Sequence, residues 1–188
     1  TSKHFINPTN SEYLANIVEK YGQTIDKNIH IKDNQKLILK EINKSKSDIT
    51  VIIGGTGKSE DDINFESFKL KINGLDLKPG RPFKFFSKSK RIYLFFPGNP
   101  CSSFVLTNIL IKLLINRYCF NKYNLEEKIM DIKEIKYNFT KLTRKSFLFA
   151  IMKNKKISIF KNQESSNLSN LLSSNCLAYY DKTKKIKI

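Results

Sequence analysis

The placement of glycine and proline constrains this chain more than any other feature of its sequence. All seven glycines and all five prolines lie within the first 100 of the 188 residues, and the remaining residues contain neither. The first part of the chain is therefore expected to contain tight backbone turns. The last part must turn with Asn, Asp, Ser and Lys. We expect two regions that are built differently.

Local patterns in the first region predict alternating helices and strands. The spacing of apolar residues predicts a helix over 11–21, with Asn10 as its N-cap and Gly22 at its end. The elements expected after it are a strand over 24–31, a helix over 34–44 and a strand over 48–53 that ends at a glycine loop. Such alternation predicts an α/β domain with a parallel sheet, whose ligands bind beyond the carboxyl ends of the strands.

The remaining elements divide the chain into three parts. We expect strands over 83–86 and 92–96 and a helix over 102–118 that is capped by Ser102 or Ser103, then strands over 129–137, 146–152, 157–160 and 177–180, and a short element over 167–172. The predicted boundaries are an α/β domain over 1–118, a connector over 119–128 and a small β-rich domain over 129–188.

The glycine loop over 54–62 has the sequence GGTGKSEDD. Its glycines allow backbone N–H groups to approach a phosphate, and Thr56 and Ser59 can donate to the phosphate oxygens. Asp61 or Asp62 can hold Mg²⁺. Taken alone, such a segment is more often a glycine turn before a solvated acidic helix start. It is not a Walker A loop, because the four-residue gap before Gly-Lys-Ser/Thr is absent.

Two further loops carry groups that suit anions. Lys78 and Arg81 flank a rigid proline–glycine turn, which aims two cations at one place. The second loop precedes Ser102 at the start of a predicted helix, where backbone N–H groups can receive an anion. Its residues are Pro97, Gly98, Asn99 and Pro100. Each loop also has a plain structural reading as a turn or a strand-to-helix corner.

The net charge of +17 comes almost entirely from lysine, since only four of the 34 basic residues are arginine. No run of five basic residues occurs, and nucleic-acid sites favour arginine, so we do not expect a nucleic-acid partner. Three scattered cysteines and two histidines supply neither a zinc cage nor a disulfide framework. The apolar stretch over 104–115 is too short to span a bilayer. We expect a cytoplasmic protein without a membrane partner.

The order and spacing of the three loops resemble the MoeA/gephyrin family, the molybdopterin molybdenumtransferases. The resembling segments are NSEYL (10–14), Asp48 with the strand leading into GGTGKSEDD, LKPGRP (77–82) and FPGNPCS (96–102). The resemblance continues more weakly through TRKSFL (143–148) and the serine-rich SSNLSNLLSSNCL (165–177).

The resemblance implies a three-layer molybdopterin-binding domain with a mostly parallel sheet, followed by a small C-terminal β-barrel. It implies the insertion of molybdate into adenylated molybdopterin with Mg²⁺-dependent release of AMP, by a protein that is a homodimer at full length. The residues that it places at the pterin pocket are Gly54, Gly55, Thr56 and Gly57. Those that it places at the reacting centre are Asp62, Lys78, Arg81 and Ser102, assisted by Arg144 and by Ser165 or Ser166.

The sequence also departs from the pattern of that family. Gly57 and Ser59 stand where MoeA proteins more often have Ser and Gly, so the loop leans toward the molybdopterin adenylyltransferases, and Phe149 replaces a second arginine. No segment corresponds to the family's first strand with its GDEL-type element or to its N-terminal domains. We therefore expect the C-terminal portion of a longer transferase, with a sheet edge left for another segment. An adenylyltransferase-like or CinA-like relative and a noncatalytic interaction module stay as alternatives.

Overall fold

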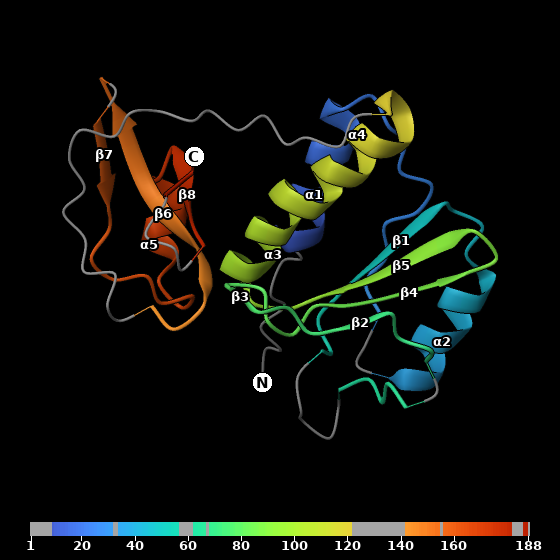
Figure 1. Ribbon diagram of the computed structural model, residues 1–188. Coiled ribbons are helices and arrows are strands. Elements are labelled where there is room, and N and C mark those ends of the chain that lie inside the picture. The colour runs from blue at the N-terminus through green and yellow to red at the C-terminus, as the bar shows by residue number, and fades with distance from the viewer. Residues whose placement is uncertain are drawn as a thin grey trace, which may run out of the picture.

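The computed structural model describes residues 9–31, 34–56, 62–66, 68–121, 142–154, 156–181 and 186–187 (Figure 1). Its helices are α1 (Thr9–Lys20), α2 (Gln35–Lys44), α3 (Pro100–Leu106), the π-helical turn η1 (Thr107–Ile111), α4 (Lys112–Phe120) and α5 (Leu168–Ser173). Its strands are β1 (Ile49–Ile53), β2 (Ile72–Asn73), β3 (Leu77–Lys78), β4 (Lys84–Lys88), β5 (Arg91–Phe96), β6 (Lys145–Lys153), β7 (Lys156–Ile159), β8 (Cys176–Tyr180) and β9 (Ile186–Lys187).

The first sheet has the strand order β1-β5-β4-β2. Strand β1 pairs with β5 in parallel, but β4 pairs with β5, and β2 with β4, in antiparallel fashion. The prediction of a mostly parallel sheet is therefore wrong for the described strands, and the sheet is mixed. The reason lies in the turn between β4 and β5, where Ser89 and Lys90 both have positive φ. Two such residues in a two-residue loop form a tight hairpin, which requires antiparallel neighbours.

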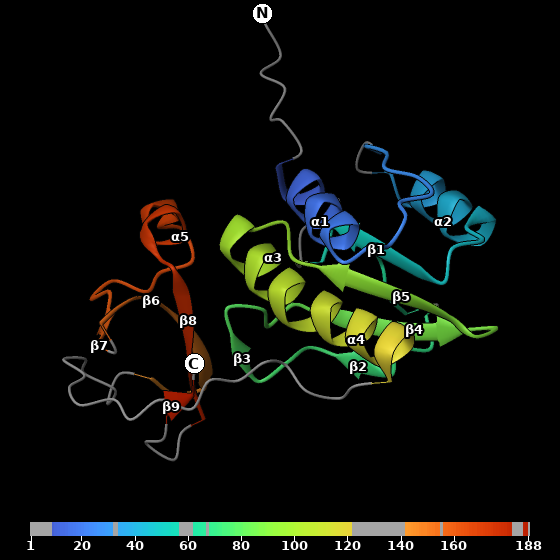
Figure 2. The same ribbon diagram turned by 90° about the horizontal axis from the view of Figure 1, so that it is seen from above.

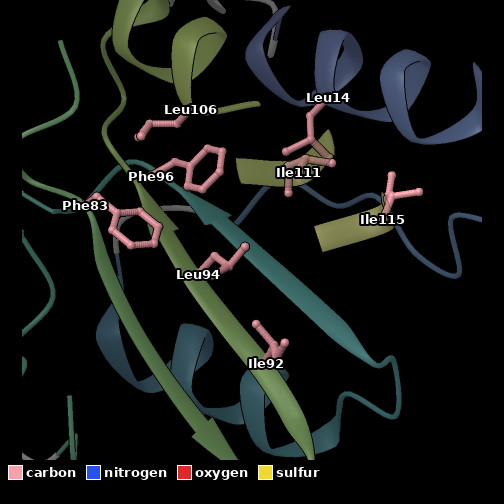
Figure 3. Close-up of a cluster of buried hydrophobic side chains, with 8 residues drawn as sticks. All are labelled: Leu14, Phe83, Ile92, Leu94, Phe96, Leu106, Ile111 and Ile115. Carbon is pink, nitrogen blue, oxygen red and sulfur yellow. The ribbon is translucent and has the colours of Figure 1, made fainter. Parts of the chain in front are cut away.

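Strand β5 is the centre of a three-layer arrangement. Its side chains alternate, so that Ile92, Leu94 and Phe96 face α1 and the α3–α4 helix, as Figure 3 shows. Tyr93 and Phe95 face the other way and form a separate core cluster with residues of α2. Helices cover both faces of the sheet (Figure 1), which confirms the predicted three-layer α/β architecture.

Helix α1 confirms the predicted first helix, except at its start. It begins at Thr9, so Asn10 lies inside the helix and is not its N-cap. The amide Nδ2 of Asn10 instead donates to the carbonyl oxygen of Gly98, 2.9 Å away. The helix ends as predicted at Gly22, whose φ is +71° and whose N–H donates to Glu19.

The strand predicted over 24–31 is wrong, because these residues form no strand. Most of the segment is exposed, and Ile29 keeps 46% of its surface in solvent. Strand formation needs a neighbouring strand to pair with and a face to bury. Among the described strands, β1 pairs only with β5, so its outer edge has no partner.

The second sheet has the order β3-β6-β8-β9, with β7 also paired to β6. The hairpin of β6 and β7 and the strand β8 confirm the predicted elements near these positions. The described strands follow an open path, and the C-terminal β-barrel stays a prediction. The strand predicted over 129–137 lies outside the described residues. Strand β3 comes from the first part of the chain and pairs in parallel with β6.

The helix Pro100–Phe120, made of α3, η1 and α4, lies between the two sheets (Figure 2). By length and composition alone it is the one described helix that could cross a membrane. Leu106 and Ile111 belong to the core of the first sheet, whereas Val105 packs with Phe149 of the second sheet. These contacts on two sides are those of a core helix.

Candidate functional site

The loops that follow β1 and β5 lie side by side at one edge of the first sheet. The parallel register sets Ile53 opposite Phe96, and the N–H of Gly54 donates to the carbonyl oxygen of Phe96 at 3.0 Å. A Cβ atom built at Gly98 would lie 3.4 Å from the Cα atom of Gly54. The structure therefore brings together two of the three loops that the sequence predicts to bind a ligand.

The glycine loop is closed at its base. The N–H of Ile63 donates to the carbonyl oxygen of Gly55 at 3.0 Å, so the chain returns to the sheet edge directly after Asp62. Gly55 has a φ of +60°, and a Cβ atom there would lie 3.2 Å from the side chain of Ile63. This closure fixes Asp62 beside the loop. Three predicted site residues, Gly57, Ser59 and Asp61, lie outside the described residues.

Lys84 is a cation at this edge that the sequence analysis does not identify. Its Nζ donates to the carbonyl oxygen of Thr56 at 3.1 Å and lies 4.6 Å from the ring centroid of Phe65. Burial lowers the pKa of Lys84, and attraction by the charge of Asp62 opposes that shift. The sequence could have identified Lys84 only through its position. It begins the antiparallel strand β4 opposite Phe95, and therefore lies where β5 ends.

The start of α3 differs from its prediction. Its N-cap is Asn99, whose side chain accepts from the N–H of Ser102 at 3.0 Å, and Pro100 occupies the first turn. Neither Ser102 nor Ser103 is the cap; both are buried, with 6% and 1% of their surface exposed. The N–H of Ser103 donates to the carbonyl oxygen of Asn99. These two N–H groups are therefore engaged and do not form the expected anion cradle.

The predicted cations Lys78, Arg81 and Arg144 meet where β3 pairs with β6. A pocket of about 320 Å³ is lined by Arg81, Arg144, Asp76 and the chain over 73–75. A smaller pocket of about 100 Å³ is lined by Lys78, Arg144 and residues around the start of β6. The parallel pairing of β3 with β6 creates this arrangement, since it sets Lys78 opposite Ser146, two residues after Arg144.

Asp76 is a second residue that sequence analysis does not single out. Its carboxylate lies 3.9 Å from Nε of Arg144, and both side chains are substantially exposed. An exposed pair of this kind contributes little to stability. It does place one negative charge among the three cations, so the pockets are positive but not uniformly so.

Ser165 and Ser166 do not line either pocket. Ser165 reaches the first sheet through its backbone, because its carbonyl oxygen accepts from Nδ2 of Asn99 at 3.0 Å. Ser166 is exposed. Ser102 also stays outside the pocket linings. The predicted site residues thus form two neighbouring groups, one at the sheet edge and one at the β3–β6 pairing.

No three His, Cys, Asp or Glu side chains gather into a metal-ligand cluster in the part of the chain that the structure describes. The described candidate for a cation at the glycine loop is Asp62, since Asp61 lies outside that part. Cys101 is buried, and burial raises the pKa of its thiol, which makes it a packing residue at the start of α3.

A family model described as "Probable molybdopterin binding domain" matches residues 3–116. The chain belongs to this molybdopterin-binding domain family. The match covers α1 through most of α4 and includes the glycine loop, Lys78, Arg81 and the loop before α3.

Two curated relatives are similar over shorter stretches. A protein of Pediococcus pentosaceus described as competence-damage inducible is 39% identical over 72 residues, which are 37% of this chain and 17% of the relative. A protein of Methanocaldococcus jannaschii described as a molybdopterin biosynthesis protein is 28% identical over 110 residues, 55% of this chain and 28% of the relative. The chain therefore spans well under half the length of either relative.

Solved structures share the fold over nearly the whole chain. The crystal structure of the molybdopterin biosynthesis moeA protein from Pyrococcus horikoshii has a TM-score of 0.71 at 22% identity, over 96% of this chain and 46% of that one. A molybdenum cofactor biosynthesis protein from Pyrococcus furiosus has a TM-score of 0.65 at 21% identity, over 92% of this chain and 57% of that one. At these identities the likeness shows the fold alone.

Proposed function

We propose that this chain carries the molybdopterin-binding part of a molybdopterin molybdenumtransferase, which inserts molybdate into adenylated molybdopterin and releases AMP. The observation that carries the proposal is the pairing of β3 with β6. It brings Arg144, which precedes a strand of the C-terminal sheet, to the pockets lined by Lys78 and Arg81. A molybdopterin-binding domain that acts alone would not need a cation from a second sheet.

The charges of these pockets suit a tetrahedral oxyanion. Arginine presents a planar fork that can bind two oxygens at once, and lysine adds a compact charge. Arg81, Arg144 and Lys78 would hold molybdate or a phosphate group of the substrate. The described pocket of about 320 Å³ is open and large enough for such an anion. Ser102 and one of Ser165 and Ser166, which lie outside the linings of both pockets, would contribute hydroxyl groups.

The glycine loop would hold the pterin side of the substrate. Gly54 and Gly98 leave backbone surface without side chains at the sheet edge, where a planar ring system can approach closely. Thr56 is buried beneath this edge, and Lys84 holds its carbonyl oxygen. Pro97 is buried beside them and gives the second loop a rigid start.

Asp62 fits a magnesium ion of the kind that bridges protein and phosphate. Magnesium keeps several waters and is held by one or two carboxylates together with substrate phosphates, so a single described carboxylate beside the loop is sufficient. When bound, the ion would reduce the negative charge of the phosphate oxygens. Lys84 supplies a fixed positive charge next to the same carboxylate. The homodimer stays a prediction for the full-length protein.

A second candidate is an adenylyltransferase-like or CinA-like activity. The sequence of the glycine loop favours it, and so does the 39% identity to the competence-damage inducible protein. That relative is matched over 72 residues, which are 37% of this chain. A noncatalytic interaction module predicts binding without turnover.

Two incubations of the longest form of the protein separate these readings. Adenylated molybdopterin with molybdate should yield AMP if the first proposal is correct. Molybdopterin with ATP should yield adenylated molybdopterin if the second is correct. Chromatographic separation of the nucleotides measures both products. Failure to bind molybdopterin in either incubation would refute both enzymatic readings.

A further inference from the structure

One side chain connects two of the predicted site serines. The Oδ1 atom of Asn99 accepts from the N–H of Ser102 at 3.0 Å, and the Nδ2 atom of the same amide donates to the carbonyl oxygen of Ser165 at 3.0 Å. Ser102 lies in the first turn of α3, whereas Ser165 belongs to the loop before α5, 66 residues from Asn99. The two halves of one planar amide thus hold two different parts of the chain.

We propose that Asn99 is a positioning residue that sets where the loop of Ser165, and with it the C-terminal sheet next to Arg144, lies against α3. The proposal rests on the proposed function, since that function gives Arg144 its part in binding the oxyanion. A carboxamide is rigid and planar, so its donor and its acceptor keep a fixed separation. A change in either hydrogen bond therefore changes the distance between the two serines.

The other contacts between α3 and the second sheet constrain the position of the Ser165 loop less strongly. Cys101, Val105 and Phe149 form a buried apolar cluster between α3 and the second sheet. Burial of this kind is favourable but has no preferred direction. The thiol of Cys101 reaches the carbonyl oxygen of Asn167 only at 3.9 Å, and sulfur is a weak donor. The bond from Asn99 is the well-formed directional contact among them.

The loop that contains Ser165 has its own internal support. The side-chain amide of Gln163 accepts from the N–H of Phe149 and donates to its carbonyl oxygen, both at 2.9 Å, as a neighbouring strand would. Asn170 donates from its side chain to the carbonyl oxygen of Asn162. Because the loop is supported on its own side, Asn99 determines where the loop sits against α3 and not how the loop is folded.

The substitution Asn99→Asp separates the two hydrogen bonds. Aspartate is a good N-cap, so the acceptor for Ser102 is kept and α3 should stay intact. The donor to Ser165 is replaced by an oxygen that faces a carbonyl oxygen, so the second bond is lost. The matched control is Asn167→Asp. Asn167 caps α5 through its own Oδ1, and among the described residues no contact joins its Nδ2 to α3.

Two measurements on the longest form of the protein test the proposal. In the AMP-release assay, Asn99→Asp should raise the KM for molybdate about tenfold and leave kcat within about threefold, while Asn167→Asp changes neither. Alkylation of the Cys101 thiol, which is buried between α3 and the second sheet, should be accelerated at least about fivefold in Asn99→Asp, with hydrogen exchange of the Ser103 amide in α3 unchanged.

Each result decides one question. Unchanged alkylation of Cys101 in Asn99→Asp overturns the positioning role whether or not the protein is active. Faster alkylation with an unchanged KM also overturns it, because the position of the loop would then not matter to the oxyanion. An inactive wild type whose Asn99→Asp variant shows faster alkylation supports the structural part of the proposal and refutes the proposed function.

Discussion

The ammonium group of Lys84 donates to the carbonyl oxygen of Thr56 at 3.1 Å and so ties the start of β4 to the glycine loop after β1. The two residues are 28 positions apart, and the contact closes one side of the sheet edge at which β1 and β5 end. Because the ammonium is partly buried, keeping it charged lowers the free energy of unfolding. This loss disappears as the pH rises and the group gives up its proton. The glycine loop is thereby coupled to a titratable group.

The pH dependence of stability should reveal this coupling. Burial places the folded-state pKa of Lys84 below its ordinary value of 10.5. Between these two values the unfolded chain binds more protons than the folded one, so the free energy of unfolding rises with pH across that window. Lys84→Met removes this rise, whereas Lys88→Met, at the exposed end of the same strand, keeps it. Urea denaturation at a series of pH values up to 10.5 measures the difference, and equal slopes in both variants would contradict the assignment.

Gly80 should tolerate a side chain less well than Gly22. Gly80 has a φ of +129°, and a Cβ atom there would lie 3.1 Å from Cδ2 of Leu106. Gly22 has a φ of +71° with open space around the position. We expect Gly80→Ala to cost about 2–3 kcal/mol of unfolding free energy and Gly22→Ala about 1 kcal/mol, since only the first adds a clash to backbone strain. Chemical denaturation measures both, and a Gly80→Ala variant as stable as Gly22→Ala would be inconsistent with this packing.

Two leucines provide a test of the core. Leu106 is fully buried beneath the Gly80 turn, whereas Leu172 keeps 85% of its surface exposed on α5. Leu106→Ala should reduce the free energy of unfolding by about 3–4 kcal/mol, because it removes buried methyl groups and leaves a cavity. Leu172→Ala should change it by less than about 0.5 kcal/mol. Comparable losses in the two variants would show that the helix Pro100–Phe120 is packed differently.

Local signals in the sequence were sufficient for many of the elements. The β-branched run before Gly54 forms β1, Gly22 ends α1, and the lysine-rich turn after residue 152 joins β6 to β7. Each of these depends on residues close together in the chain. The three loops were also recognisable by their Gly, Pro and Asn residues, and the parallel register of β1 and β5 places two of them side by side.

The errors concern relationships that are not local. Residues 24–31 alternate like a strand, but strand formation depends on a neighbour that local sequence does not reveal. Serine is a good N-cap, yet Asn99 precedes Pro100 and takes that position in α3. Lys84 was missed because its importance comes from the distant Thr56. The pairing of β3 with β6 joins segments 68 residues apart, from Leu77↔Lys145, and has no local signal.

The most direct test of the central proposal is the rate of AMP release from adenylated molybdopterin at increasing molybdate, measured for the wild type, Arg144→Gln and Arg117→Gln. Arg144 lines both pockets, whereas Arg117 lies in the last turn of α4 and lines neither. The account predicts saturable, molybdate-dependent release, with a KM for molybdate raised about tenfold in Arg144→Gln and unchanged in Arg117→Gln. A rate of AMP release that does not depend on the molybdate concentration, or that is the same in Arg144→Gln as in the wild type, would contradict an oxyanion site shared by the two sheets.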